Sequence, residues 1–157
     1  MKQLNVIGLD KQGAETLAAK LNELLANYQI LYMNVRGFHW NVRGERFFEL
    51  HAKFEETYNE LLLKVDEIAE RILTLGQKPQ HSYSTYIQGS QIKEATNVVD
   101  GRDCVTQLLE GYKVLIALQR DILEHAGKLD DEGTASLMSD YIKEQEKTAW
   151  MLTSYMG

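Results

Sequence analysis

Residues 47–75, FFELHAKFEETYNELLLKVDEIAERILTL, carry the pattern that decides the fold. Large apolar side chains recur along them at steps of three or four, at Phe47, Leu50, Phe54, Tyr58, Leu61, Val65, Ile68, Ile72 and Leu75. This spacing is typical of one face of an α-helix that packs against a core. The stretch therefore predicts one long amphipathic helix, which Gly76 ends.

The sequence on either side of this stretch predicts three more long helices and no strand. The first is expected to begin after an Asp10 N-cap and to end near His39, before a turn at residues 41–44. The third is expected over about 100–126, with Gly127 closing it. The fourth follows 130–133 and continues to about residue 152.

The long connection at residues 76–99 separates two helical hairpins. It is mostly polar, and a serine cap predicts a short helix at Ser90–Thr96. Two hairpins joined by a long crossover predict an all-α, ferritin-like four-helix bundle, with a short helix in the crossover between the second and third helices. The length suits one domain spanning 1–157.

Composition narrows the class of function. The formal net charge is −6, which disfavours binding to the phosphates of DNA, and no apolar run is long enough to span a membrane. The N-terminal residues lack the pattern of a signal peptide, and the one cysteine, Cys104, cannot form an internal disulfide. We therefore expect a cytoplasmic protein.

Histidines and acids that suit a metal ion are spread along the second helix. His51 and Asp66 are fifteen residues apart, which is about 22 Å along a helix, so the two side chains cannot bind one ion. They nevertheless share a face, and Glu70 follows Asp66 by one turn. His39, on the other side of the hairpin turn, is expected to approach His51. The two groups become useful together only if a second copy of the helix lies antiparallel alongside.

A two-fold axis near Tyr58 or Asn59 brings His51 of one chain opposite the acids of the other, which gives two equivalent sites per dimer. The alternative is that each histidine and acid is an ordinary exposed or hydrogen-bonded residue. A di-iron site within one bundle instead calls for Glu-x-x-His motifs. None exists, because the residues three before the four histidines are Arg36, Phe48, Lys78 and Ile122.

Three segments carry a resemblance to a known family. They are Phe38-His39-Trp40-Asn41-Val42 with Phe47-Phe48-Glu49-Leu50-His51, then Asp66-Glu67-Ile68-Ala69-Glu70-Arg71, and finally Glu144-x-Glu146-Lys147-x-x-Trp150-Met151-Leu152. Together these segments resemble the Dps family, the mini-ferritins, across most of the chain.

The resemblance implies a ferroxidase that oxidises Fe(II) to Fe(III), preferably with hydrogen peroxide, and stores ferric oxide inside a hollow homo-dodecamer. It implies a di-iron site with His39 and His51 from one subunit and Asp66 and Glu70 from its neighbour. Glu55 matches a further acidic ligand that is usually aspartate in the family. Zinc can substitute for iron in such a ligand set.

The family also suggests roles for other residues. It places an acidic iron-entry pore near Asp130-Asp131-Glu132, although Ser136 stands where some relatives carry a pore acid. Trp40 is similar to a tryptophan that lies near the site, and hairpin packing is its alternative role. Two other functions remain open: a DNA-compacting protein, which a low-salt gel shift would reveal, and a partner-binding bundle without redox chemistry.

Overall fold

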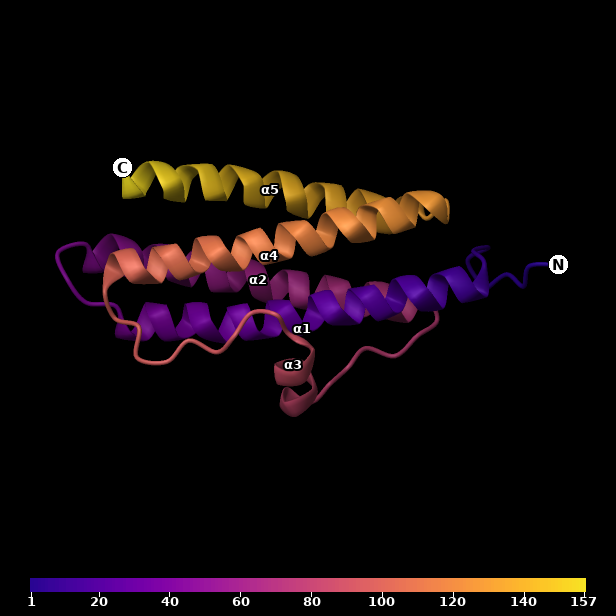
Figure 1. Ribbon diagram of the computed structural model, residues 1–157, viewed down its shortest axis with the longest axis horizontal. Coiled ribbons are helices and arrows are strands. Elements are labelled where there is room, and N and C mark those ends of the chain that lie inside the picture. Colours follow the sequence, from indigo (N-terminus) through magenta and orange to yellow (C-terminus); the bar gives the residue numbers. More distant parts are fainter.

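The computed structural model describes residues 1–157 and contains five α-helices, with only isolated β-bridges beside them. They are α1 (Lys11–Asn41), α2 (Phe47–Thr74), α3 (Tyr83–Gly89), α4 (Gly101–Lys128) and α5 (Glu132–Met156). Figure 1 shows the hairpins α1–α2 and α4–α5 side by side, with the crossover and α3 running along the outside. The predicted all-α, ferritin-like bundle with a short helix in its crossover is confirmed.

The predicted stripe of α2 faces the core. Leu50, Phe54, Leu61, Ile68 and Ile72 are buried, and they belong to a cluster of 32 buried hydrophobic residues drawn from all five helices and the segments that join them. Burying a side chain of this kind contributes roughly 1.5–3 kcal/mol relative to exposure. The amphipathic pattern therefore fixes which face of α2 points inward and which face stays free.

Aspartates begin three of the long helices. Each accepts a hydrogen bond from the backbone N–H three residues later, in the pairs Asp10–Gly13, Asp100–Asp103 and Asp131–Thr134. Such caps satisfy N–H groups that the first turn of a helix leaves free. The predicted Asp10 cap is confirmed, and α1 continues two residues beyond His39 before Gly44 turns the chain at φ +122°.

The short crossover helix lies at Tyr83–Gly89, so the prediction of a helix at Ser90–Thr96 is wrong. Ser82 caps this helix, whereas the Ser90 hydroxyl donates to the Ile92 carbonyl at 2.7 Å and lies 3.1 Å from the side-chain oxygen of Asn27. The buried Asn27 carbonyl oxygen also accepts from the backbone N–H groups of Gln91 and Ile92. Because these hydrogen bonds to α1 engage the backbone after Ser90, this segment does not form a helix. No local sequence pattern predicts such bonds.

The prediction that Gly127 closes α4 is wrong, because Gly127 lies within the helix. Asp130 instead takes the left-handed conformation, with φ +60°. The backbone N–H of Asp131 then donates back to the Ala126 carbonyl at 2.8 Å, which is the closing bond of a Schellman motif. The turn between α4 and α5 therefore depends on an aspartate where glycine is more usual.

The centre of the bundle holds a closed ring of polar side chains. The Tyr28 hydroxyl donates to Gln119 (2.5 Å), the Gln119 amide donates to Gln145 (2.8 Å), and the Gln145 amide donates to the Tyr28 oxygen (2.6 Å). Burial raises the pKa of Tyr28 well above its ordinary value, so the hydroxyl keeps its proton. The three residues satisfy one another, and none is a carboxylate or imidazole of the kind that binds metal inside di-iron bundles.

Candidate metal site

The α1–α2 hairpin brings His39 and His51 together. Their rings stack with centroids 3.9 Å apart and planes 11° from parallel. His39 lies in the last turn of α1 and His51 in the first two turns of α2, so the antiparallel hairpin sets them side by side. The predicted approach of the two histidines within one chain is confirmed.

Each histidine anchors the other. The Nδ1 of His39 lies 2.7 Å from the His51 carbonyl oxygen, and the Nδ1 of His51 lies 2.7 Å from the His39 carbonyl oxygen. A carbonyl only accepts, so both Nδ1 atoms carry the proton. In the neutral rings Nε2 is then left with a free lone pair. A metal-binding histidine is oriented in this way when its other nitrogen donates to a carbonyl.

The end of α1 makes this exchange possible. The backbone N–H of Arg43 donates to the Val99 carbonyl at 2.8 Å, rather than back to His39 as it would in a longer helix. The crossover therefore ends α1, and the His39 carbonyl stays free to accept from His51. The sequence pattern predicts the two histidines but not this role of the crossover.

Aromatic neighbours fix the two rings. Phe47 stacks on His51 with centroids 4.9 Å apart, and Tyr58 meets His39 edge-on at 5.4 Å. His39 is buried and His51 is half-buried. Both imidazoles are thus held by packing as well as by hydrogen bonds, which favours a preformed site.

The predicted acidic ligands lie exposed on α2. Asp66 and Glu70 are neighbours, and a hydrogen bond to Asp66 together with its negative charge raises the pKa of Glu70 above its ordinary value. Two like charges at this spacing repel, and a cation between them relieves the repulsion. Glu55 is also exposed and makes no ion pair within the chain.

One protomer does not complete a metal site. The structure brings His39 to His51 and Asp66 to Glu70, but no three histidine, cysteine, aspartate or glutamate side chains of the chain converge on one point. The histidine pair and the acid pair are separated along α2, as the fifteen-residue spacing requires.

Exposed apolar residues share the face that carries these groups. Phe48, Leu62 and Leu73 are 84%, 46% and 58% exposed. At about 100° per residue, they fall within about 60° of His51 around the axis of α2. The buried stripe alone does not predict them, although large apolar residues outside that stripe indicate a second apolar face on α2.

The predicted pore acids differ in their surroundings. Asp131 is 2% exposed and pairs with Arg71, whose Nη2 lies 2.6 Å from Oδ1 and whose Nε donates to Thr134. Asp131 is therefore not available to line a channel. Asp130 and Glu132 remain exposed.

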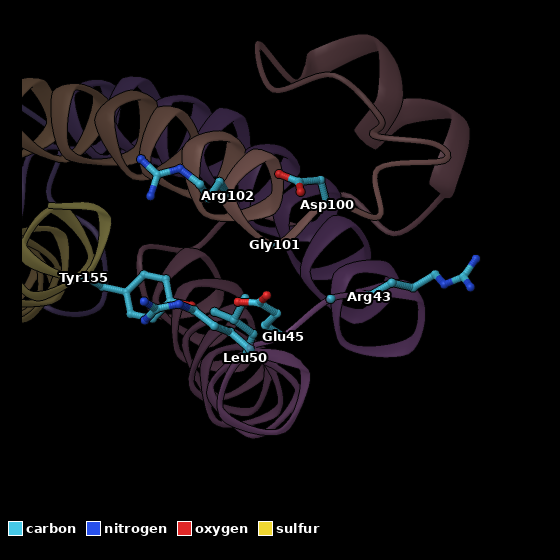
Figure 2. A pocket seen from close by; sticks show the side chains of 9 residues that line it. Arg43, Glu45, Leu50, Asp100, Gly101, Arg102 and Tyr155 are labelled. Atoms are coloured by element: carbon cyan, nitrogen blue, oxygen red, sulfur yellow. The ribbon is translucent and has the colours of Figure 1, made fainter.

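A cavity of about 200 Å³ lies beyond the hairpin turn, lined by residues of that turn, by the start of α4 and by Tyr155 of α5. Figure 2 shows the Arg43 and Arg102 side chains extending from its rim in different directions. Arg46 lies over the Tyr155 ring at 4.9 Å. None of the five predicted ligands lines this cavity.

None of the five helices combines the length and apolar character that crossing a lipid bilayer requires.

Comparison with known proteins identifies the family. Residues 18–157 match the model of the ferritin-like domain. A DNA protection during starvation protein of Porphyromonas gingivalis is 41% identical over 154 residues, which cover 98% of this chain and 97% of that protein.

Solved structures agree. A Dps protein of Vibrio cholerae, described as a member of a superfamily of ferritin-like diiron-carboxylate proteins, superimposes with a TM-score of 0.97 at 57% identity over 98% of this chain and 97% of that one. A Dps protein of Bacillus brevis gives 0.90 at 33% identity, over 93% and 98% of the two chains. The chain belongs to the ferritin-like family and, within it, to the Dps proteins.

Proposed function

We propose that this protein is an iron-storage ferroxidase whose site forms between two copies of the chain. The observation that carries the proposal is the mutually anchored histidine pair, with two free Nε2 lone pairs on a face whose acids lie too far along α2 to reach it. A second chain supplies the missing carboxylates.

The proposed dimer places two α2 helices antiparallel about an axis near Tyr58 and Asn59. Asp66 and Glu70 of each subunit then lie opposite His39 and His51 of the other, because a two-fold axis exchanges positions reciprocally. The same contact covers the exposed apolar side chains of Phe48, Leu62 and Leu73. Burial of these side chains supplies the association energy that the metal ligands alone would not.

The residues fit iron as substrate. Two neutral imidazoles suit Fe(II), and the carboxylates of Asp66 and Glu70 suit the harder Fe(III). Glu55, one turn after His51, is placed to bind a second ion. The superfamily of the V. cholerae protein is described as diiron-carboxylate, and a di-iron site requires such a second ion. The same donors also accept Zn(II).

Hydrogen peroxide is the proposed oxidant. Two ferrous ions give one electron each to one peroxide molecule, which takes up two protons and yields two water molecules. The single-electron route, which releases hydroxyl radical, is thereby avoided. We propose that the ferric product is stored inside a homo-dodecamer of one-domain subunits in the cytoplasm.

Protection of DNA, named for the P. gingivalis relative, then follows from removal of iron and peroxide. The net charge of −6 gives the surface little attraction for DNA, so strong binding is not part of the proposal.

The test is an anaerobic titration of the assembled protein with Fe(II), followed by measured additions of peroxide. We expect about two ferrous ions to be oxidised per peroxide, with no radical adduct of a spin trap. One ion per peroxide with strong adduct formation, as free Fe(II) gives in the same buffer, would overturn the proposed activity.

A further inference from the structure

Arg36 lies at the centre of an aromatic cluster beside the histidine pair. Its guanidinium carbon is 5.6 Å from the ring centroid of Tyr32 and 5.0 Å from those of Trp40 and Tyr58. Tyr58 is also the ring that meets His39 edge-on. Arg36 and His39 therefore pack against the same tyrosine.

The hydrogen bonding of Arg36 is incomplete within the protomer. Nη1 donates to the Tyr32 hydroxyl at 2.9 Å, but the buried Nε has no acceptor. None of the seven ion pairs of the chain includes Arg36. The guanidinium edge formed by Nε and Nη2, which suits a carboxylate bidentately, is left without a partner.

The unpaired guanidinium charge of Arg36 is unfavourable in this half-buried position. Aromatic faces stabilise a cation, but they do not satisfy an N–H donor. A half-buried guanidinium with an unmet donor gains most from a carboxylate. The nearest turn of α2 offers Glu55, yet the structure forms no bond between Glu55 and Arg36.

A carboxylate does arrive in the proposed dimer. Since His39 lies beside His51 in an antiparallel hairpin, Arg36 lies near the level of residue 54, about 4.5 Å along the helices from the histidine pair. The partner subunit's Asp66 lies opposite His51, and its side chain leans toward the N-terminus of its own helix, which is the direction of Arg36. An arginine side chain is long enough to cover this offset along the helix axes.

We infer that Arg36 is a positioning residue that binds the partner subunit's Asp66 across the dimer interface in the absence of iron. This inference rests on the proposed function, because it uses the dimer that completes the iron site. In the metal-free dimer, the Arg36 guanidinium then stabilises the interface through this ion pair. The acid that receives Fe(II) is thereby held in place before the metal arrives.

The test is a double-mutant cycle on the metal-free protein, with Arg36→Gln, Asp66→Asn and both together. Subunit dissociation is followed by native mass spectrometry over a dilution series in chelator, with circular dichroism to confirm the helices. We expect the effect of Asp66→Asn on the dissociation constant to shrink by at least about threefold when Arg36 is already replaced. Arg36→Lys, which keeps the charge but loses the fork, should restore part of the coupling.

Controls separate the alternatives. Arg102→Gln removes an exposed arginine of α4 outside the cluster, and its effect should simply add to that of Asp66→Asn. Additive effects of Arg36→Gln and Asp66→Asn, or coupling of Arg36 to Glu55→Gln alone, would overturn the inference. The proposed function fails by a different result, namely unchanged iron oxidation by a protein that carries Asp66→Ala.

Discussion

Alanine at His39 is expected to slow peroxide-driven oxidation of Fe(II) by roughly 100-fold or more. The substitution removes one of the two Nε2 lone pairs that are free to bind metal. It also removes the Nδ1–H group of His39, which donates to the His51 carbonyl and so anchors His51. Alanine at Asp66 should have an effect of similar size, although this residue lies far from His39 within one chain. Stopped-flow absorbance of the ferric product measures both rates.

Matched controls are available for these variants. His81→Ala removes an exposed histidine of the crossover, and Asp140→Ala removes an exposed acid of α5. Both should oxidise iron at the rate of the parent. Parental rates in the His39 or Asp66 variants instead would show that the site has been assigned to the wrong residues.

Alanine at Asp131 is expected to lower the free energy of unfolding by about 3–5 kcal/mol. The buried carboxylate pairs with Arg71 and caps α5 through Thr134, so its loss leaves a partly buried guanidinium without a counter-charge and a helix without a cap. Chemical denaturation followed by circular dichroism measures the change.

The neighbouring acid serves as the comparison for Asp131. Glu132 is exposed, so Glu132→Ala should change the stability by no more than about 0.5 kcal/mol. A loss below about 1 kcal/mol for Asp131→Ala would mean that the pair with Arg71 contributes little.

The long helices and the histidine pair could be predicted from the sequence because local rules govern them. A repeat of three and four residues fixes the buried face of α2, and positions symmetric about a hairpin turn must meet. Asp10 could be recognised as a cap for the same reason, since an N-cap bonds only to the next few residues.

The features that escaped prediction depend on distant residues. The local sequence predicts a helix cap at Ser90, but Asn27 of α1 contacts the Ser90 hydroxyl and the backbone that follows it. The local sequence predicts an exposed acid at Asp131, but Arg71, sixty residues earlier, pairs with it. The aromatic cluster around Arg36 likewise joins α1 to α2, and sequence periodicity does not specify which rings surround a cation.

Mixed assembly tests most directly whether two chains build each iron site. Subunits carrying His39→Ala and subunits carrying Asp66→Ala are dissociated, mixed in equal amounts and reassembled. In a mixed dimer one site loses both groups and the other keeps both, so random pairing should restore about a quarter of the parental sites. We expect fast oxidation of a matching fraction of the iron, although each variant alone is slow. A mixture as inactive as its two components would contradict a site shared between subunits.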